Sequence, residues 1–173
     1  VEAAKEHIRA GDIFQVVLSQ RFRLPLGETD VFDVYRAMRI INPSPYMYFL
    51  RMPDCVVAGA SPETLVRLED AQVHVRPIAG TRHRGRTEDE DQDIAQDLLG
   101  DPKERAEHVM LVDLARNDLG RVGVPGTIRV DPSRSVEYYS HVMHLVSGVV
   151  GELEAGRDAF DLFAAAFPAG TLV

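Results

Sequence analysis

Acidic residues and a histidine occur near the middle of the chain, in a stretch rich in apolar residues. The segment 101–122, DPKERAEHVMLVDLARNDLGRV, contains Glu104, Glu107, His108 and Asp113. On a helix, which turns by about 100° per residue, the first three of these side chains fall on one face. Carboxylates on a buried helix are costly unless a cation pairs with them. The pattern therefore predicts either ion pairs or a hard divalent cation such as Mg²⁺, held by one or two carboxylates.

The same segment indicates a helix with clear ends. Asp101 is followed by proline, which is typical of a capped helix start, and Gly120 marks the end. The residues between them are apolar on nearly every side, which predicts a buried helix. Partners for the ion-pair alternative are available in Lys103, Arg105 and Arg116. Both alternatives stay open on the residues alone.

Further residues outside this helix could take part in chemistry. Glu63 follows Ser-Pro at the end of an apolar strand. It could be a turn carboxylate, or a general acid or base whose pKa is tuned by partial burial. Gln15 is an amide on a strand, and His144 on a valine-rich face is typical of a satisfied core histidine. Gly80 and Thr81 could present an N–H group and a hydroxyl to an anion, or could form only a turn.

The elements that must position these residues mix helices and strands irregularly. Without a regular strand–helix–strand rhythm, the order favours an α+β fold with a largely antiparallel sheet in one domain over residues 1–173. Residues 82–93 are highly charged and are predicted to form an exposed loop. Helices are expected over residues 1–10, 30–40, 91–99, 101–120 and 158–167, and strands over 12–24, 46–52, 55–60, 64–68, 72–78, 124–130 and within 136–153.

Composition excludes several classes of function. The net charge of −8 argues against nonspecific binding to nucleic acid or to anionic membranes. A single cysteine, Cys55, cannot form an internal disulfide, which fits the reducing cytoplasm. The sequence shows no signal peptide and no apolar run of about 18 residues that would span a membrane. Motifs for ATP, NAD, structural zinc and serine hydrolysis are also missing.

Seven segments, in order, give the chain a specific family resemblance. They are GDIFQVVLSQRF, NPSPYMYFL, GASPE, RPIAGTRHRG, the central helix, YYSHVMHLVSGVVGEL and FPAGT. This series resembles the chorismate-utilising enzymes and, within them, the large subunits of anthranilate synthases. The resemblance implies an α+β fold of two antiparallel sheets packed together and flanked by helices. It also implies Mg²⁺-dependent conversion of chorismate and ammonia, the latter from glutamine through a partner amidotransferase, to anthranilate and pyruvate.

The resemblance implies a role for each matching residue. Glu63 would be the general acid that protonates the leaving C4 hydroxyl, and His144 would assist pyruvate elimination beside the ring. Glu107 would be a Mg²⁺ ligand, and Glu104 an outer ligand one turn earlier. The remaining matches are the substrate contacts Gly80, Thr81 and Thr171, and a segment that binds tryptophan as feedback inhibitor, formed by Pro45, Tyr46 and Met47.

Two positions select a reaction within the family. Isochorismate and salicylate synthases carry a water-activating lysine where this chain has Gln15, which cannot act as a base. Aminodeoxychorismate synthases typically carry a nucleophilic lysine where this chain has Ala79. Both residues favour the anthranilate-forming enzymes, with these sister enzymes as the alternative.

The chain also departs from the family pattern at its ends. It begins with valine, and after PAGT it ends at Leu172-Val173, where the family continues with Ser-Gly-Ala-Pro-Lys. A second Mg²⁺ glutamate, the Arg and Tyr that grip the substrate carboxylates, and half of the tryptophan pocket are therefore expected outside this chain. We expect part of a catalytic domain that is inactive by itself and self-associates, with a noncatalytic binding module as the alternative.

Overall fold

The structure, a computed structural model, describes residues 1–14 and 16–169. Within them the chain forms two compact units, one over residues 1–63 and one from residue 64 onward. Each unit has its own helices and strands, and strands pair only as antiparallel neighbours in the described residues. This confirms the predicted α+β class. None of the described helices is long and apolar enough to span a membrane.

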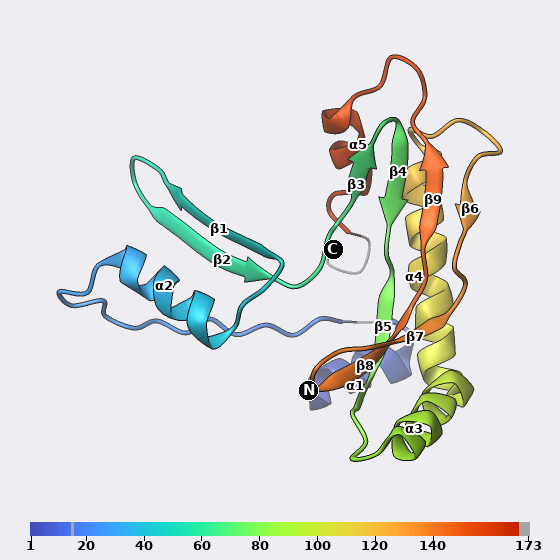
Figure 1. The fold of residues 1–173 in the computed structure, drawn as a ribbon, viewed down its shortest axis with the longest axis horizontal. Coiled ribbons are helices and arrows are strands. Elements are labelled where there is room, and N and C mark those ends of the chain that lie inside the picture. Colours follow the sequence, from blue (N-terminus) through green and yellow to red (C-terminus); the bar gives the residue numbers. More distant parts are fainter. Residues whose placement is uncertain (15, 170–173) are drawn as a thin grey trace. The chain divides into compact units, whose positions relative to one another are not determined.

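The first unit contains two helices and one strand pair. Gly11 ends the first helix in the left-handed region (φ 81°), and the Asp30 carboxylate accepts the Phe32 N–H at 2.9 Å to cap the second. Phe32 and Tyr35 pack against Phe49 of the strand pair, with ring centroids 5.1 and 5.5 Å away. The elements, labelled in Figure 1, are α1 (Glu2–Ala10), α2 (Val31–Ile41), β1 (Tyr46–Arg51) and β2 (Val56–Ser61).

The strand predicted over residues 12–24 is wrong for the part of that segment which the structure describes. The alternation of apolar and polar residues is present, but no strand pairs with the segment. Its large apolar side chains are exposed, with Phe14 at 84% and Leu24 at 89%. Because a strand needs a neighbour for its backbone hydrogen bonds and for one of its faces, alternation alone does not produce it.

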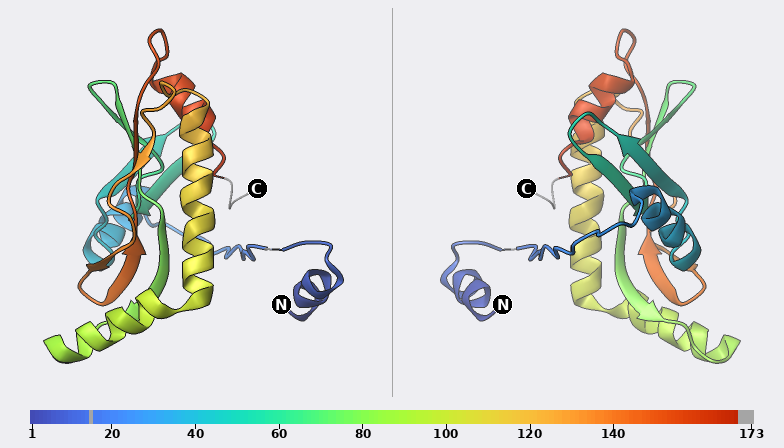
Figure 2. Two further views of the ribbon diagram at one scale, coloured as in Figure 1. Left: turned by 90° about the vertical axis from the view of Figure 1, so that its right-hand side faces the viewer. Right: turned by 90° about the vertical axis from the view of Figure 1, so that its left-hand side faces the viewer.

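The second unit holds two sheets and three helices in its described residues. The four-stranded sheet has the order β3-β4-β9-β6, and the three-stranded sheet has the order β5-β8-β7. Figure 2 shows α4 running along this unit, with α3 at its beginning and α5 near its end. The elements are β3 (Arg67–Glu69), β4 (Gln72–Val75), β5 (Ile78–His83), α3 (Glu88–Gly100), α4 (Pro102–Gly120), β6 (Arg129–Val130), β7 (Ser135–Tyr138), β8 (Val142–Val146), β9 (Val149–Glu152) and α5 (Ala159–Ala166).

Two apolar clusters stabilise the second unit. The larger joins α4 and α5 to the four-stranded sheet, and the smaller joins α3 to the three-stranded sheet. The buried members of the larger cluster are Val73, Ala115, Leu119, Val122, Val149, Leu153, Leu162 and Ala165. Those of the smaller cluster are Ala95, Leu98, Met143 and Leu145.

The charged loop predicted over residues 82–93 is also wrong. β5 continues to His83 and α3 begins at Glu88, so much of this run is regular structure. The Arg84 guanidinium binds the Asp91 carboxylate, which is only 7% exposed, and holds the pKa of that carboxyl below its ordinary value. These two charges therefore form a part-buried ion pair, whereas the predicted exposed loop would have left both of them in solvent.

The central helix is confirmed between Asp101 and Gly120, but the prediction that it is buried on nearly every side is wrong. Its buried residues are His108, Ala115 and Leu119, whereas Val109 is 52% exposed. The sheets of its own unit therefore cover only part of the apolar surface of this helix.

We expect Leu145→Ala to lower the free energy of unfolding of the chain by about 2–5 kcal/mol, because it leaves a cavity in the smaller cluster. Phe160→Ala is the control, since its side chain lies in the same unit and is 83% exposed. Urea unfolding followed by circular dichroism measures both. Equal stability of the two variants would contradict the placement of Leu145 in the core.

Candidate functional site

A β-bulge in β5 brings two of the predicted site residues together. Ala79 pairs with Leu145 and Thr81 pairs with His144, so Gly80 is the extra residue, with φ at 63°. Opposed residues of an antiparallel pair share a face. The bulge therefore leaves Ala79 buried beside Leu145 and turns the exposed Thr81 to the face of His144.

The imidazole of His144 is held through one of its nitrogens. Nδ1 lies 3.1 Å from the Gly80 carbonyl oxygen and 3.1 Å from Thr81 Oγ1. A carbonyl oxygen can only accept, so we assign the ring proton to Nδ1, which donates to Gly80. The other nitrogen, Nε2, then carries the lone pair. Tyr139 packs edge-on against the half-buried ring at 5.4 Å. His144 can thus accept a proton at Nε2, which a core histidine with both ring nitrogens bonded could not do.

Glu104 lies next to the same bulge on its other side. A Cβ atom at Gly80 would be 3.1 Å from Glu104 Oε2, so the missing side chain lets α4 approach β5 here. Glu104 Oε1 lies 3.6 Å from Arg82 Nη1 and 3.8 Å from Lys103 Nζ, and the side chain is 14% exposed. For this carboxylate the predicted ion-pair alternative is confirmed, with Lys103 among the expected partners.

Glu107 differs from the other acidic residues of α4. It is half-buried, one turn beyond Glu104, and its side chain has no hydrogen bond or ion pair within the described part of the chain. Asp113, by comparison, is exposed and binds Arg116 at 3.0 Å. Among the residues described, no group of three or more His, Cys, Asp or Glu could hold a metal. Any ion at Glu107 would therefore need further ligands from outside the described residues, from water or from substrate.

His108, on the same helix, belongs to the core. It is fully buried, and its Nε2 lies 2.7 Å from Ser147 Oγ, which also accepts the Arg134 backbone N–H at 2.9 Å. Burial, and then the charge of Arg134, lower the pKa of His108 below its ordinary value. Its Nδ1 is buried without a partner among the described residues. His108 is therefore a neutral side chain at neutral pH.

The first unit contains the other predicted residues that the structure describes. Glu63 lies two residues after Ser61, the last residue of β2, and is exposed rather than partly buried; its carbonyl accepts the Ser61 hydroxyl at 3.0 Å. Pro45 leads into β1, where Tyr46 pairs with Ser61 and Met47 is half-buried. The proposed inhibitor segment and the Glu63 turn thus meet at one end of this strand pair. Gln15 and Thr171 lie outside the described residues.

Sequence reasoning missed two residues that contact this site. Arg82 lies beside Glu104, and Tyr139 lies beside His144. In the sequence Arg82 is one residue of a charged run, and no local signal marks its ion pairs, because its acceptors Asp97 and Asp101 lie 15 and 19 residues further along the chain.

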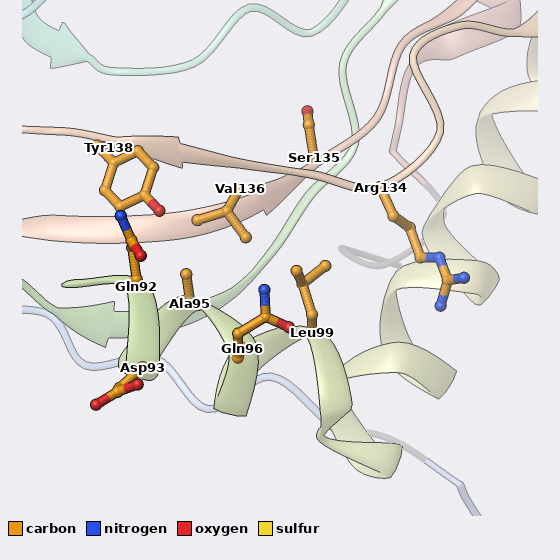
Figure 3. A pocket seen from close by; sticks show the side chains of 9 residues that line it. All are labelled: Gln92, Asp93, Ala95, Gln96, Leu99, Arg134, Ser135, Val136 and Tyr138. Atoms are coloured by element: carbon orange, nitrogen blue, oxygen red, sulfur yellow. The ribbon is translucent and has the colours of Figure 1, made fainter. Parts of the chain in front are cut away.

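A separate groove of about 440 Å³ lies between α3 and β7. Figure 3 shows Gln92, Gln96 and Leu99 of α3 facing Val136, with the Arg134 guanidinium pointing away from them. None of the predicted site residues lines this groove.

Comparison with known proteins identifies a family that matches the whole chain. The profile of the family described as chorismate binding enzyme matches residues 1–173. Anthranilate synthase component 1 of Aquifex aeolicus is 59% identical over 173 residues, and that of Mycobacterium tuberculosis is 55% identical over 178. Each comparison covers 99% of this chain but only 35% and 34% of the relative, so the chain spans about a third of these relatives.

Solved structures agree. The crystal structure of anthranilate synthase component I from Streptococcus pneumoniae matches with a TM-score of 0.81 and 44% identity, over 99% of this chain and 37% of that one. A Bacillus anthracis protein named as an isochorismate synthase matches with a TM-score of 0.64 and 30% identity, over 82% of this chain and 39% of that one.

We expect the stability of the chain to fall as the pH drops below about 6.5, the ordinary pKa of histidine. The folded state holds the pKa of His108 below that of the unfolded state. The unfolded chain therefore binds more protons, and stability is complete above the unfolded pKa and declines below it. His108→Gln, which keeps a partner for Ser147, should flatten the dependence of urea unfolding between about pH 5 and about pH 7.5. An unchanged slope would show that His108 does not cause it.

Proposed function

Because the chain belongs to the family of chorismate binding enzymes, we propose that it forms part of the active site of an anthranilate synthase component 1. The reaction converts chorismate and ammonia to anthranilate and pyruvate. The observation that carries the proposal is the bulge at Gly80, which places the Thr81–His144 pair and the carboxylate of Glu104 on its two sides. The names of the Aquifex aeolicus and Mycobacterium tuberculosis relatives support this reaction over that of the sister enzymes.

Glu107 fits a Mg²⁺ site by the chemistry of its donor. Its half-buried carboxylate lacks a compensating cation in the described residues, and hard divalent ions favour such oxygen ligands. Glu104 is already paired with Arg82 and Lys103, which fits an outer role. Bound Mg²⁺ would neutralise a carboxylate of the dianionic chorismate and polarise the substrate.

The protein residues supply the proton transfers. His144 has its Nδ1 proton engaged by the Gly80 carbonyl, so its Nε2 can accept the ring proton lost as pyruvate is eliminated and the ring becomes aromatic. Glu63 would protonate the C4 hydroxyl group, because loss of hydroxide without an acid is prohibitive. Thr81, whose hydroxyl contacts His144, would orient the substrate beside the ring, as would Gly80 and Thr171.

The partners follow from the same proposal. Ammonia would come from glutamine through an amidotransferase subunit. Tryptophan, as feedback inhibitor, would bind at Pro45, Tyr46 and Met47, where β1 pairs with the strand that leads to Glu63. That pairing gives the inhibitor a direct structural connection to the proposed general acid.

The metal proposal can be tested in a chimera in which this chain replaces the matching third of the Aquifex aeolicus enzyme. Glu107→Gln should reduce Mg²⁺-dependent anthranilate formation at least about 100-fold, because a charged ligand becomes neutral. Asp113→Asn, an exposed residue of the same helix, is the control and should retain activity. Product fluorescence with chorismate, ammonium and varied Mg²⁺ measures the effect. Equal activity of the two variants would remove Glu107 from the site.

The product of the same chimera tests the reaction. We expect anthranilate from the unaltered chimera, and less of it from Gln15→Lys and from Ala79→Lys, because each introduces the lysine that the sister enzymes use. At position 79 the added ammonium would also be buried, since Ala79 is 7% exposed. Chromatography of the products distinguishes the reactions. Isochorismate as the main product of the unaltered chimera would overturn the assignment of Gln15.

A further inference from the structure

Arg82 lies directly after Thr81 in β5 but faces the opposite side of the sheet. It pairs in register with Met143, which is fully buried, and its side chain is 25% exposed. The guanidinium reaches the junction of α3 and α4. There Nε donates to Asp97 Oδ2 at 3.2 Å, and Nη2 donates to Asp101 Oδ2 at 2.8 Å.

The third nitrogen of Arg82 connects to the candidate site. Nη1 donates to the Thr81 carbonyl oxygen at 3.2 Å and lies 3.6 Å from Glu104 Oε1. One planar group therefore contacts the backbone of the residue that orients His144 and a carboxylate on the proposed metal-binding face of α4. All three guanidinium nitrogens of Arg82 are used.

Asp101 extends this arrangement into α4. Its Oδ1 accepts the backbone N–H groups of Lys103 at 2.9 Å and Glu104 at 3.2 Å, while its Oδ2 accepts from Arg82. The cap that begins the helix is thus fixed to β5 by the same guanidinium. These bonds hold the pKa of the Asp101 carboxyl below its ordinary value, so the cap stays charged at neutral pH.

We propose that Arg82 is a positioning residue that fixes the first turn of α4, with Glu104 and then Glu107, relative to the Thr81–His144 pair. This inference rests on the function proposed above, and Arg82 itself contacts no reacting atom. The planar fork of arginine can serve three acceptors at once, which the single ammonium of lysine cannot reproduce with the same geometry. Arg82 therefore fixes these groups through the directions of its N–H bonds as well as through its charge.

Histidine spectra of the chain itself provide a test that does not depend on activity. In Arg82→Gln, release of the Thr81 carbonyl should loosen the bonds to His144 Nδ1, and the ring ¹⁵N shifts of His144 should move toward a mixture of tautomers. Arg116→Gln is the matched control, since Arg116 is an exposed residue of α4 whose one ion-pair partner in the described part of the chain is Asp113. It should leave these shifts unchanged. Unchanged His144 shifts in Arg82→Gln would overturn the proposal.

Arg82→Lys keeps the positive charge and covers the case in which Arg82→Gln does not fold. We expect this variant to keep most of the stability of the chain while still shifting the His144 signals. Spectra of Arg82→Lys identical to those of the unaltered chain would show that charge alone is sufficient, which would also overturn the proposal.

The chimera separates this inference from the proposed function. With saturating Mg²⁺, Arg82→Gln should lower kcat by about 100-fold, the effect of misplacing a catalytic group by about 1 Å, with a much smaller change in the KM for chorismate. Arg116→Gln should keep the unaltered kcat. If the unaltered chimera forms no anthranilate, the proposed function fails. If it is active and Arg82→Gln keeps its kcat, only the role of Arg82 fails.

Discussion

The candidate site depends on one extra residue in an antiparallel strand pair. Without the bulge at Gly80, Ala79 and Thr81 would face the same side of the sheet, and Thr81 could not contact His144. The positive φ of Gly80 makes the bulge possible, and its missing Cβ allows Glu104 to lie against the strand. A single backbone feature thus sets both the orientation of the imidazole and the approach of the acidic helix.

The buried and half-buried polar groups of the second unit are compensated in different ways. These differences distinguish residues with a structural role from candidates for a catalytic or ligand role. Asp91 and Asp101 accept from arginines and from backbone N–H groups, and Glu104 lies beside two cations. His108 is neutral and bound to a buried serine. Glu107 has no such compensation in the described residues, and this contrast supports its assignment as a ligand.

Sequence reasoning identified elements whose signals are local. The capped starts of α2 and α4 follow from Asp30 and Asp101, which accept from backbone N–H groups as expected. The prediction of a strand over residues 12–24 was wrong because strand pairing depends on residues far away in the chain. The bulge could not be predicted either, because Ala-Gly-Thr fits a turn, a plain strand or a bulge until its partner in β8 is known. Arg82 escaped notice for the same reason, since its acceptors lie 15 and 19 residues further along the chain.

The helix α4 ends in the larger apolar cluster and begins beside the smaller one. Its 19 residues extend over about 28 Å. Its end packs into the cluster with eight buried residues, whereas its acidic first turn lies beside the cluster with four. Free energy of local opening follows the density of buried contacts. We therefore expect amide hydrogens near the start of α4 to exchange at a lower energetic cost than those near its end, where Ala115 and Leu119 are buried. The proposed site thus lies at the end of α4 whose order depends on the Arg82 and Asp101 contacts more than on apolar packing.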